Sequence, residues 1–211
     1  MKKFTIIAGL FFLFAMSSAA QLSFYLIDNF EDGTFSKWFV FDRVQPKIIM
    51  PPSVDKKDLI AESCGEYALQ LKGSTTDWYV GGIGTNLTVD ANEYSRLQLD
   101  MFGSPYGGKV KIELYEDDNG NSIIEQDESN NWSATKDDIW FVELPILGEG
   151  YTRFSIPFSA FKDANPGVGD DKFNPDKMNN SGGLLRVQLV FVADQKEGEI
   201  EAVLDNVLLT Y

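Results

Sequence analysis

The sequence predicts an all-β protein, built as a sandwich of two antiparallel sheets. About ten short segments are apolar runs or alternate between apolar and polar residues, and Gly, Pro, Asn and Asp separate them. No amphipathic stretch is long enough for a helix of ordinary length, and the sequence contains no internal repeat. Many short strands between turn signals are typical of β-sandwiches and barrels.

Residues 1–20 are expected to form a signal peptide. Two lysines precede an apolar run over residues 4–16, and a small-residue cleavage site ends at Ala20. The apolar run is short for a bilayer span; the alternative is an N-terminal membrane anchor. We therefore expect residues 21–211 to be a single exported domain, secreted to the periplasm, the exterior or the cell surface, with no membrane span after the signal peptide is removed.

The composition argues against several functional classes. The formal net charge is −14, which repels the phosphate backbones of nucleic acids and anionic lipids. The absence of His removes the usual general base, the Ser-His-Asp triad and most zinc sites. The single cysteine, Cys64, cannot form an internal disulfide, and we expect it to be partly buried and inert. No nucleic-acid partner is expected.

In the first half of the domain, strands are expected at residues 22–30, 38–41, 66–72, 76–85 and 97–102. Three prolines favour a loop or irregular edge over residues 45–58. Trp78 and Tyr79 could form a platform for ring stacking, although large aromatic residues in a glycine-rich strand favour the core.

In the second half, strands are expected at residues 109–115, 139–144, 151–156, 184–193 and 200–210, with one helical turn at 158–161. A polar loop of about twenty residues, 163–183, is long for a compact domain, and such loops are usually functional. The first and last strands are both long and apolar, which favours their pairing in a jelly roll.

An acidic loop over residues 117–128 has the ligand spacing of a calcium loop. Oxygen ligands are expected at relative positions 1, 3, 5, 7, 9 and 12, which are Asp117, Asn119, Asn121, Ile123 (through its carbonyl), Glu125 and Glu128. Ser122 stands where such a loop usually has glycine, and the available glycine is Gly120. The alternative is an acidic, solvated hairpin loop whose Asn and Gly residues serve the turn.

A polar face is expected from strand alternation. The side chains that point away from the predicted core are Gln98, Asp100, Lys111, Glu113, Tyr115, Arg186 and Gln188. If their strands are neighbours, these residues could bind sugar hydroxyls and stack on a ring, with Tyr106 as an exposed loop aromatic. The alternative is an ordinary solvated face with cross-strand charge pairs such as Lys111 with Asp100.

A resemblance to a known family spans essentially the whole mature chain. The motifs that carry it are, in order, IDNFEDG, GEYALQLKG, WYVGGIG, LQLDMFG, VKIELYEDD, YTRFSIPFSAF, LRVQLVFVA and LDNVLL. Together they resemble the galactose-binding-like jelly rolls of carbohydrate-binding modules, especially family 11. The resemblance implies a calcium ion held by Glu31 and Asp205 with backbone oxygens near Gly33; the alternative is that these residues cap turns. The acidic loop resembles the calcium loops of dockerins and of bacterial surface B-type repeats, here inserted between two strands.

The sequence therefore predicts an exported, non-catalytic carbohydrate-binding protein that is stabilised by calcium. Its expected partner is a neutral polysaccharide or surface glycan, because acidic polymers would be repelled. The acids of segment 199–205 do not match the E-x-D-x-E pattern of jelly-roll glycosidases, so no enzyme is expected. The alternative is a structural subunit of a bacterial surface layer, sheath or filament, in which the 163–183 loop and the acidic insertion contact other surface or filament proteins.

Overall fold

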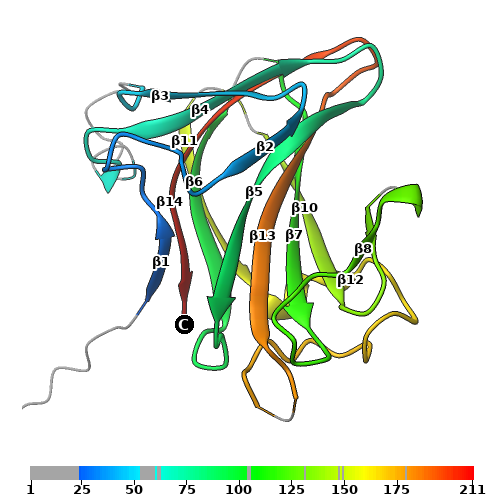
Figure 1. The fold of residues 1–211 in the computed structure, drawn as a ribbon. Helices are drawn as coiled ribbons and strands as arrows, with labels where there is room; N and C mark the ends of the chain where they lie inside the picture. The colour runs from blue at the N-terminus through cyan, green and yellow to red at the C-terminus, as the bar shows by residue number, and fades with distance from the viewer. Residues whose placement is uncertain are drawn as a thin grey trace, which may run out of the picture.

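The computed structural model describes residues 24–52, 60, 63–103, 106–130, 132–146, 148, 150–178 and 180–211. The expected signal peptide lies outside these residues. Two six-stranded antiparallel sheets and one small hairpin account for the strands of the described chain (Figure 1). The expected all-β jelly-roll sandwich is therefore confirmed. No helix of the described residues is long and apolar enough to cross a membrane.

Sheet A holds both ends of the described domain. Its strands are β1 (Tyr25–Asp28), β3 (Gln45–Ile49), β4 (Ala68–Ser74), β6 (Arg96–Gly103), β11 (Gly150–Pro157) and β14 (Glu199–Thr210). Their order is β11-β6-β14-β4-β3, and β1 pairs with β14. Tyr25 lies opposite Leu209 in this pairing. The expected pairing of the first and last strands is therefore confirmed.

Sheet B has the order β12-β10-β7-β13-β5-β2. Its strands are β2 (Phe39–Asp42), β5 (Tyr79–Val89), β7 (Lys109–Asp117), β10 (Ile139–Pro145), β12 (Lys162–Asp163) and β13 (Gly183–Val192). The hairpin of β8 (Gln126–Asp127) and β9 (Ser133–Ala134) carries the short helix η2 (Glu128–Asn130) between its strands. A second short helix, η3 (Phe158–Ala160), forms the expected helical turn.

The core lies between the two sheets, and strand alternation places it. On β7, Val110, Ile112 and Leu114 are fully buried, as the alternation predicts. On β13, Leu189 and Phe191 are buried in the same cluster. Burying each of these side chains contributes roughly 1.5–3 kcal/mol. The core therefore anchors β7 and β13, and the alternation places their polar residues on the opposite face.

The expectation of a loop or irregular edge over residues 45–58 is met as an edge in its first residues. Residues Gln45–Ile49 form β3, which is the edge strand of sheet A and pairs with β4. Pro46 lies opposite Leu71. An edge strand tolerates a proline because one side of the strand needs no N–H donor. Residues 53–59 lie outside the described part of the chain.

The expectation that Trp78 and Tyr79 belong to the core is wrong. Their exposed fractions are 51% and 42%. Further along β5, the rings of β2 occupy the space above two glycines, because a Cβ on Gly82 or Gly84 would lie within 2.4 Å of a ring atom of β2. The glycines of this strand therefore make room for aromatic rings from the neighbouring strand and leave the start of β5 at the surface.

Cys64 is buried, as expected, and its thiol donates a hydrogen bond to the Ile60 carbonyl. Burial, followed by the charge of Asp205, raises the pKa of the Cys64 thiol to about 12. The reactive thiolate form is therefore strongly disfavoured.

Asp28 ties the first strand to the turn that follows it. Its Oδ2 accepts the Trp38 indole N–H at 3.0 Å and its Oδ1 accepts the Phe30 backbone N–H at 3.1 Å. Asp28, Phe30 and Trp38 are all buried. We expect Asp28→Ala to lower the free energy of unfolding by roughly 2–4 kcal/mol, because two buried donors lose their acceptor.

Urea unfolding followed by tryptophan fluorescence measures this loss. Asp32→Ala is the matched control, because the exposed Asp32 carboxylate also accepts a backbone N–H, that of Thr34. The control should cost less than about 1 kcal/mol. Equal losses for the two variants would contradict the role given to Asp28.

Candidate functional site

The outer face of sheet B brings five of the predicted binding residues together. β7 and β13 are neighbours, with Arg186 opposite Tyr115, Gln188 opposite Glu113 and Val190 opposite Lys111. The alternating neighbours of these residues are buried in the core. The condition set by the sequence, that these strands lie side by side, is therefore met for Lys111, Glu113, Tyr115, Arg186 and Gln188.

Glu113 is the centre of a hydrogen-bond network on this face. Its Oε2 accepts from Gln188 Nε2 at 2.8 Å and from the Tyr115 hydroxyl at 3.2 Å. Lys111 Nζ lies 2.7 Å from Glu113 Oε1. Burial, followed by the charge of Glu113, raises the pKa of Tyr115, so this hydroxyl stays a donor. The network fixes the orientations of an amide, an ammonium group and a carboxylate.

Arg186 lies between two aromatic rings. Its guanidinium carbon is 5.0 Å from the centroid of the Phe39 ring and 5.2 Å from that of Tyr115. Arg186 Nε donates to Asn86 Oδ1 at 3.0 Å, and Nη1 donates to Gln126 Oε1 at 3.2 Å. Burial lowers the pKa of Arg186, although an arginine remains charged. The guanidinium is therefore held in one orientation on the face.

Three phenylalanines of this face were not singled out from the sequence. Phe39 and Phe41 of β2 have ring centroids 6.2 Å apart, and Lys111 Nζ lies 4.8 Å from the centroid of the Phe141 ring of β10. Phe39 is 37% exposed. The alternation of Phe39 and Phe41, and that of the two glycines on the neighbouring β5, could have indicated the two rings of β2.

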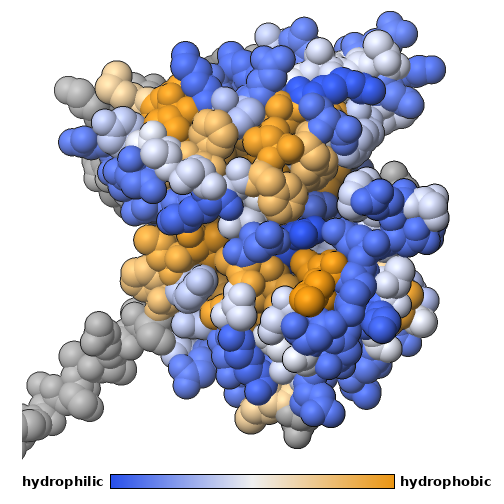
Figure 2. All heavy atoms as spheres, in the orientation of Figure 1, coloured by the Kyte–Doolittle hydropathy of each residue, from blue (hydrophilic) through white to orange (hydrophobic). Residues whose placement is uncertain are grey.

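The space-filling view shows how these residue types meet at the surface. Figure 2 has hydrophobic residues next to hydrophilic ones where β2 and β5 lie in Figure 1. The surface is hollowed between that region and the lobe that carries β8. Polar groups beside apolar rings in a hollow are the arrangement that a sugar ring requires, since its hydroxyls need partners and its C–H face needs a flat apolar surface.

The segment between β7 and β10, residues 118–138, is called the insertion below, and its β8–β9 hairpin covers one end of the outer face. Tyr115 packs against Ala134, Ile139 and Ile124, and it is only 4% exposed. The expectation that the Tyr115 ring is open for stacking is therefore wrong, because the insertion lies over it. The Tyr115 ring instead lies against the Arg186 guanidinium, whose carbon is 5.2 Å from the ring centroid.

Gln98 and Asp100 do not lie on this face. They belong to β6, which pairs with β11 and β14 in sheet A. Asp100 is completely buried and accepts two 2.7 Å hydrogen bonds from Arg153. The expectation of one face shared with β7 and β13 is wrong for these two residues, and so is the cross-strand pair of Lys111 with Asp100. Tyr106, in the turn before β7, is exposed as expected.

The predicted calcium loop uses its acid and amide groups partly for its own turn. Asp117 is buried, and its Oδ1 accepts the backbone N–H groups of Asn119 at 3.0 Å and Gly120 at 2.7 Å. Asn119 and Asn121 donate their side-chain N–H groups to Glu125. These contacts are the ones expected if the segment is a solvated hairpin loop whose Asn and Gly residues form the turn.

The remaining two positions of that loop lie at the surface. Ile123 is 60% exposed, and Glu128 is exposed in η2. Asp137, which the spacing rule does not reach, accepts the Asn119 side-chain N–H at 3.4 Å and the Asp118 backbone N–H at 3.3 Å. Calcium binding by the 117–128 loop stays a prediction, with Asp137 as a further carboxylate beside it.

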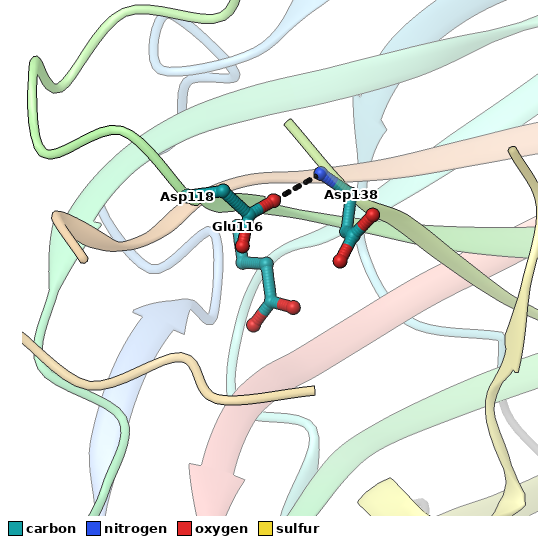
Figure 3. Close-up of side chains that lie close together, drawn as sticks. All are labelled: Glu116, Asp118 and Asp138. Atoms are coloured by element: carbon teal, nitrogen blue, oxygen red, sulfur yellow. Dashed lines mark hydrogen bonds between the residues drawn. The ribbon is translucent and has the colours of Figure 1, made fainter. Parts of the chain in front are cut away.

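A different set of acids, the acidic triad of Glu116, Asp118 and Asp138, converges at the base of the insertion (Figure 3). One oxygen of each carboxylate lies within 4.8 Å of the others, so the triad could hold a metal ion. Burial is the largest cause that raises the pKa of Glu116 to about 9, of Asp118 to about 7 and of Asp138 to about 6. The sequence spacing missed this set because Glu116 and Asp118 alternate with Asp117 and Asp138 comes from the far end of the insertion.

The family-type calcium pair is Glu31 and Asp205, the two ligands that the family resemblance implies. Glu31 follows β1, and Asp205 lies on β14. Asp205 is buried on β14, and burial raises its pKa to about 7, with contributions from the charges of Asp100 and Glu31. Asp205 Oδ2 has no hydrogen-bond partner among the described residues. Glu31 accepts the backbone N–H groups of Glu66 and Tyr67 at 3.0 Å. A buried oxygen without a partner fits a cation ligand at Asp205, whereas the Glu31 carboxylate is used by the backbone just before β4.

Comparisons with known proteins agree with this architecture. No protein-family model matches the sequence, and no curated protein matches it. Among solved structures, a family 11 carbohydrate-binding module from Clostridium thermocellum in complex with a β-1,3-1,4-mixed-linked tetrasaccharide has a TM-score of 0.58 at 14% identity, covering 90% of this chain and 96% of that one.

Two further structures are similar. A family 11 module of a cellulosomal cellulase of Clostridium thermocellum has a TM-score of 0.53 at 15% identity, covering 90% of this chain and 95% of that one. An exo-β-agarase has a TM-score of 0.55 at 10% identity, and the match covers 89% of this chain but 25% of that one. The chain therefore has the jelly-roll β-sandwich fold of carbohydrate-binding modules.

Proposed function

We propose that this protein is an exported, non-catalytic carbohydrate-binding protein and that it binds glycan on the outer face of sheet B. The observation that carries the proposal is the polar row of Arg186, Gln188, Glu113 and Lys111, with the rings of Phe39 and Phe141 at its sides. Sugar rings combine hydroxyl groups with an apolar C–H face, and this surface offers partners for both.

The network around Glu113 lowers the cost of binding. The Glu113 carboxylate accepts from Gln188 and pairs with Lys111, so both side chains are already held in place and little side-chain freedom is lost when a sugar docks. A shallow, hydrated surface of this kind supports affinities from about micromolar to millimolar. The formal net charge of −14 favours neutral glycans over uronate polymers.

The similar structures support this function by their own ligands and names. One family 11 module was solved with a bound tetrasaccharide, and the agarase match covers a quarter of a longer chain. A non-catalytic role is also supported by the absence of His, which removes the usual general base. Export is supported by the signal-like sequence of residues 1–20.

Calcium is the proposed cofactor. Its candidate ligands are hard oxygen donors, which calcium prefers, and binding to the folded state alone stabilises the fold by mass action. The sequence proposes the 117–128 loop, and the unpartnered oxygen of Asp205 supports the family-type site. When bound, the ion would supply positive charge to buried carboxylates.

A panel of insoluble and soluble glycans tests the function. We expect binding to at least one neutral polysaccharide, such as a β-glucan, mannan, xylan or galactan, measured by pull-down and then by calorimetric titration. Retention on none of them, together with ordered self-assembly of the protein, would contradict the proposal and favour a structural subunit of a surface layer, sheath or filament.

A further inference from the structure

We propose that the acidic triad of Glu116, Asp118 and Asp138 is a calcium site that joins the two ends of the insertion to the loop between β12 and β13, residues 164–182. Glu116 lies at the end of β7, Asp118 follows that strand, and Asp138 precedes β10. Figure 3 shows the three side chains close together, with the Asp138 backbone N–H bonded to the Asp118 carboxylate. Asp118 lies within the 117–128 segment, but none of the three acids is among the ligands predicted for that loop, and Asp205 is not part of the triad. The proposal rests on the calcium binding proposed above only for the identity of the ion.

Unpartnered oxygens in the triad point to a ligand. Asp138 is completely buried, yet neither of its carboxylate oxygens has a hydrogen-bond partner among the described residues, and Asp118 Oδ1 has none either. The Lys172 backbone N–H lowers the pKa of Asp138, against the larger opposite effect of burial, but it makes no hydrogen bond of standard geometry to either oxygen. Buried carboxylate oxygens are normally satisfied, so these three atoms require a cation or protons.

The other contacts of the triad hold it in place without filling it. Asp118 Oδ2 accepts the Asp138 backbone N–H at 2.7 Å. Glu116 accepts the Trp140 indole N–H at 2.9 Å and the Asn174 backbone N–H at 2.9 Å, one at each oxygen. Each Glu116 oxygen keeps a second lone pair, and these donors orient the carboxylate as outer partners of a metal ligand do.

The backbone of the 164–182 loop lies directly against the carboxylates of Asp118 and Asp138. A Cβ on Gly169 would lie 2.3 Å from Asp118 Oδ2 and 2.4 Å from Asp138 Oδ1. Gly169 also has a φ of +74°, which disfavours any other residue. Asn174, in the same loop, has a buried side-chain oxygen without a partner among the described residues. The loop therefore brings its backbone next to the acids and carries a further candidate oxygen ligand.

Calcium fits the chemistry of this set. Calcium binds six to eight oxygens at about 2.3–2.6 Å, so ligand atoms on opposite sides of one ion lie roughly 5 Å apart. The 4.8 Å limit within which the triad oxygens lie is compatible with this geometry. Magnesium requires shorter metal–oxygen distances and a stricter octahedral geometry, so we expect this site to bind magnesium more weakly than calcium. One ion would neutralise most of the charge of three crowded carboxylates.

Calorimetric titration of the chelator-treated full chain with calcium chloride tests the site. We expect Asp138→Asn to remove one binding event or to weaken it by at least about tenfold, because a direct ligand is lost. The matched control is Glu125→Gln, which alters the acidic loop but not the triad and should leave that event unchanged. Asp205→Asn, in the family-type site, should leave it unchanged as well.

Terbium luminescence gives a second readout. Because the Trp140 indole contacts Glu116, terbium in the triad should emit when tryptophan is excited. The emission should be lost in Asp138→Asn and in Trp140→Phe, whereas Trp140→Phe should still bind calcium. Asp118→Asn provides the same test if Asp138→Asn does not fold.

The outcomes separate this inference from the proposals above. Full affinity and stoichiometry in Asp138→Asn, or loss of the event in Glu125→Gln alone, would overturn the triad as the site while leaving calcium binding intact. Failure of wild-type protein to bind calcium would overturn both calcium proposals. Neither result bears on glycan binding, which the glycan panel tests separately.

Discussion

Replacing Arg186 with alanine should weaken glycan binding by about ten- to a hundredfold. A hydrogen bond from a charged donor is worth roughly 1.5–3 kcal/mol, which corresponds to that range of affinity. Arg186 is also the residue that holds the rings of Phe39 and Tyr115 on either side of one cation. The variant therefore loses a hydrogen-bond donor to the sugar and the cation that packs between these two rings. Calorimetric titration with the best glycan of the panel measures the change.

Arg96→Ala is the matched control for this prediction. Arg96 lies on β6 in sheet A, where its Nε donates to Ser155 Oγ at 2.8 Å. Its loss removes the same charge from the other sheet and should change glycan affinity by less than about twofold. A similar loss in both variants would assign the effect to net charge rather than to the outer face of sheet B.

Phe191→Ala should lower the free energy of unfolding by about 3–5 kcal/mol. Phe191 is among the largest fully buried side chains, and it packs in the core between the sheets. Removing a buried ring loses its transfer free energy and leaves a cavity. Since domains of this size are stable by about 5–15 kcal/mol, the variant approaches the limit of folding. Urea unfolding measures the change.

Val40→Ala provides the comparison on the same sheet. Val40 lies on the edge strand β2 and is 37% exposed. Its truncation should cost less than about 1 kcal/mol. A cost for Phe191→Ala that does not exceed that of Val40→Ala would contradict the placement of the core.

The fold was predictable because one physical rule governs most of it. A strand with one covered face alternates, and Val110, Ile112 and Leu114 follow that alternation into the core. The rule gives the face of each residue but not the neighbours of its strand. Gln98 and Asp100 show the consequence, because they alternate like β7 residues yet lie in the other sheet.

The outward-facing residues of the candidate sites were predictable strand by strand, but the sequence could state their meeting only as a condition on which strands are neighbours. Arg186 and Gln188 sit two residues apart on β13, and their shared face follows from the sequence. The acidic triad depends on Asp138, which a folded insertion returns to Glu116 and Asp118. A spacing rule for one continuous loop cannot include such a residue, since its position depends on how the hairpin packs.

The measurement that tests the central claim most directly is NMR mapping of the bound glycan. Backbone amide shifts of the ¹⁵N-labelled protein would be followed during titration with the best ligand of the panel. The account predicts the largest shift changes on the outer face of sheet B, around Phe39, Glu113, Arg186 and Gln188. Changes centred on sheet A, around Arg96 and Gln98, or no changes at saturating glycan, would contradict it.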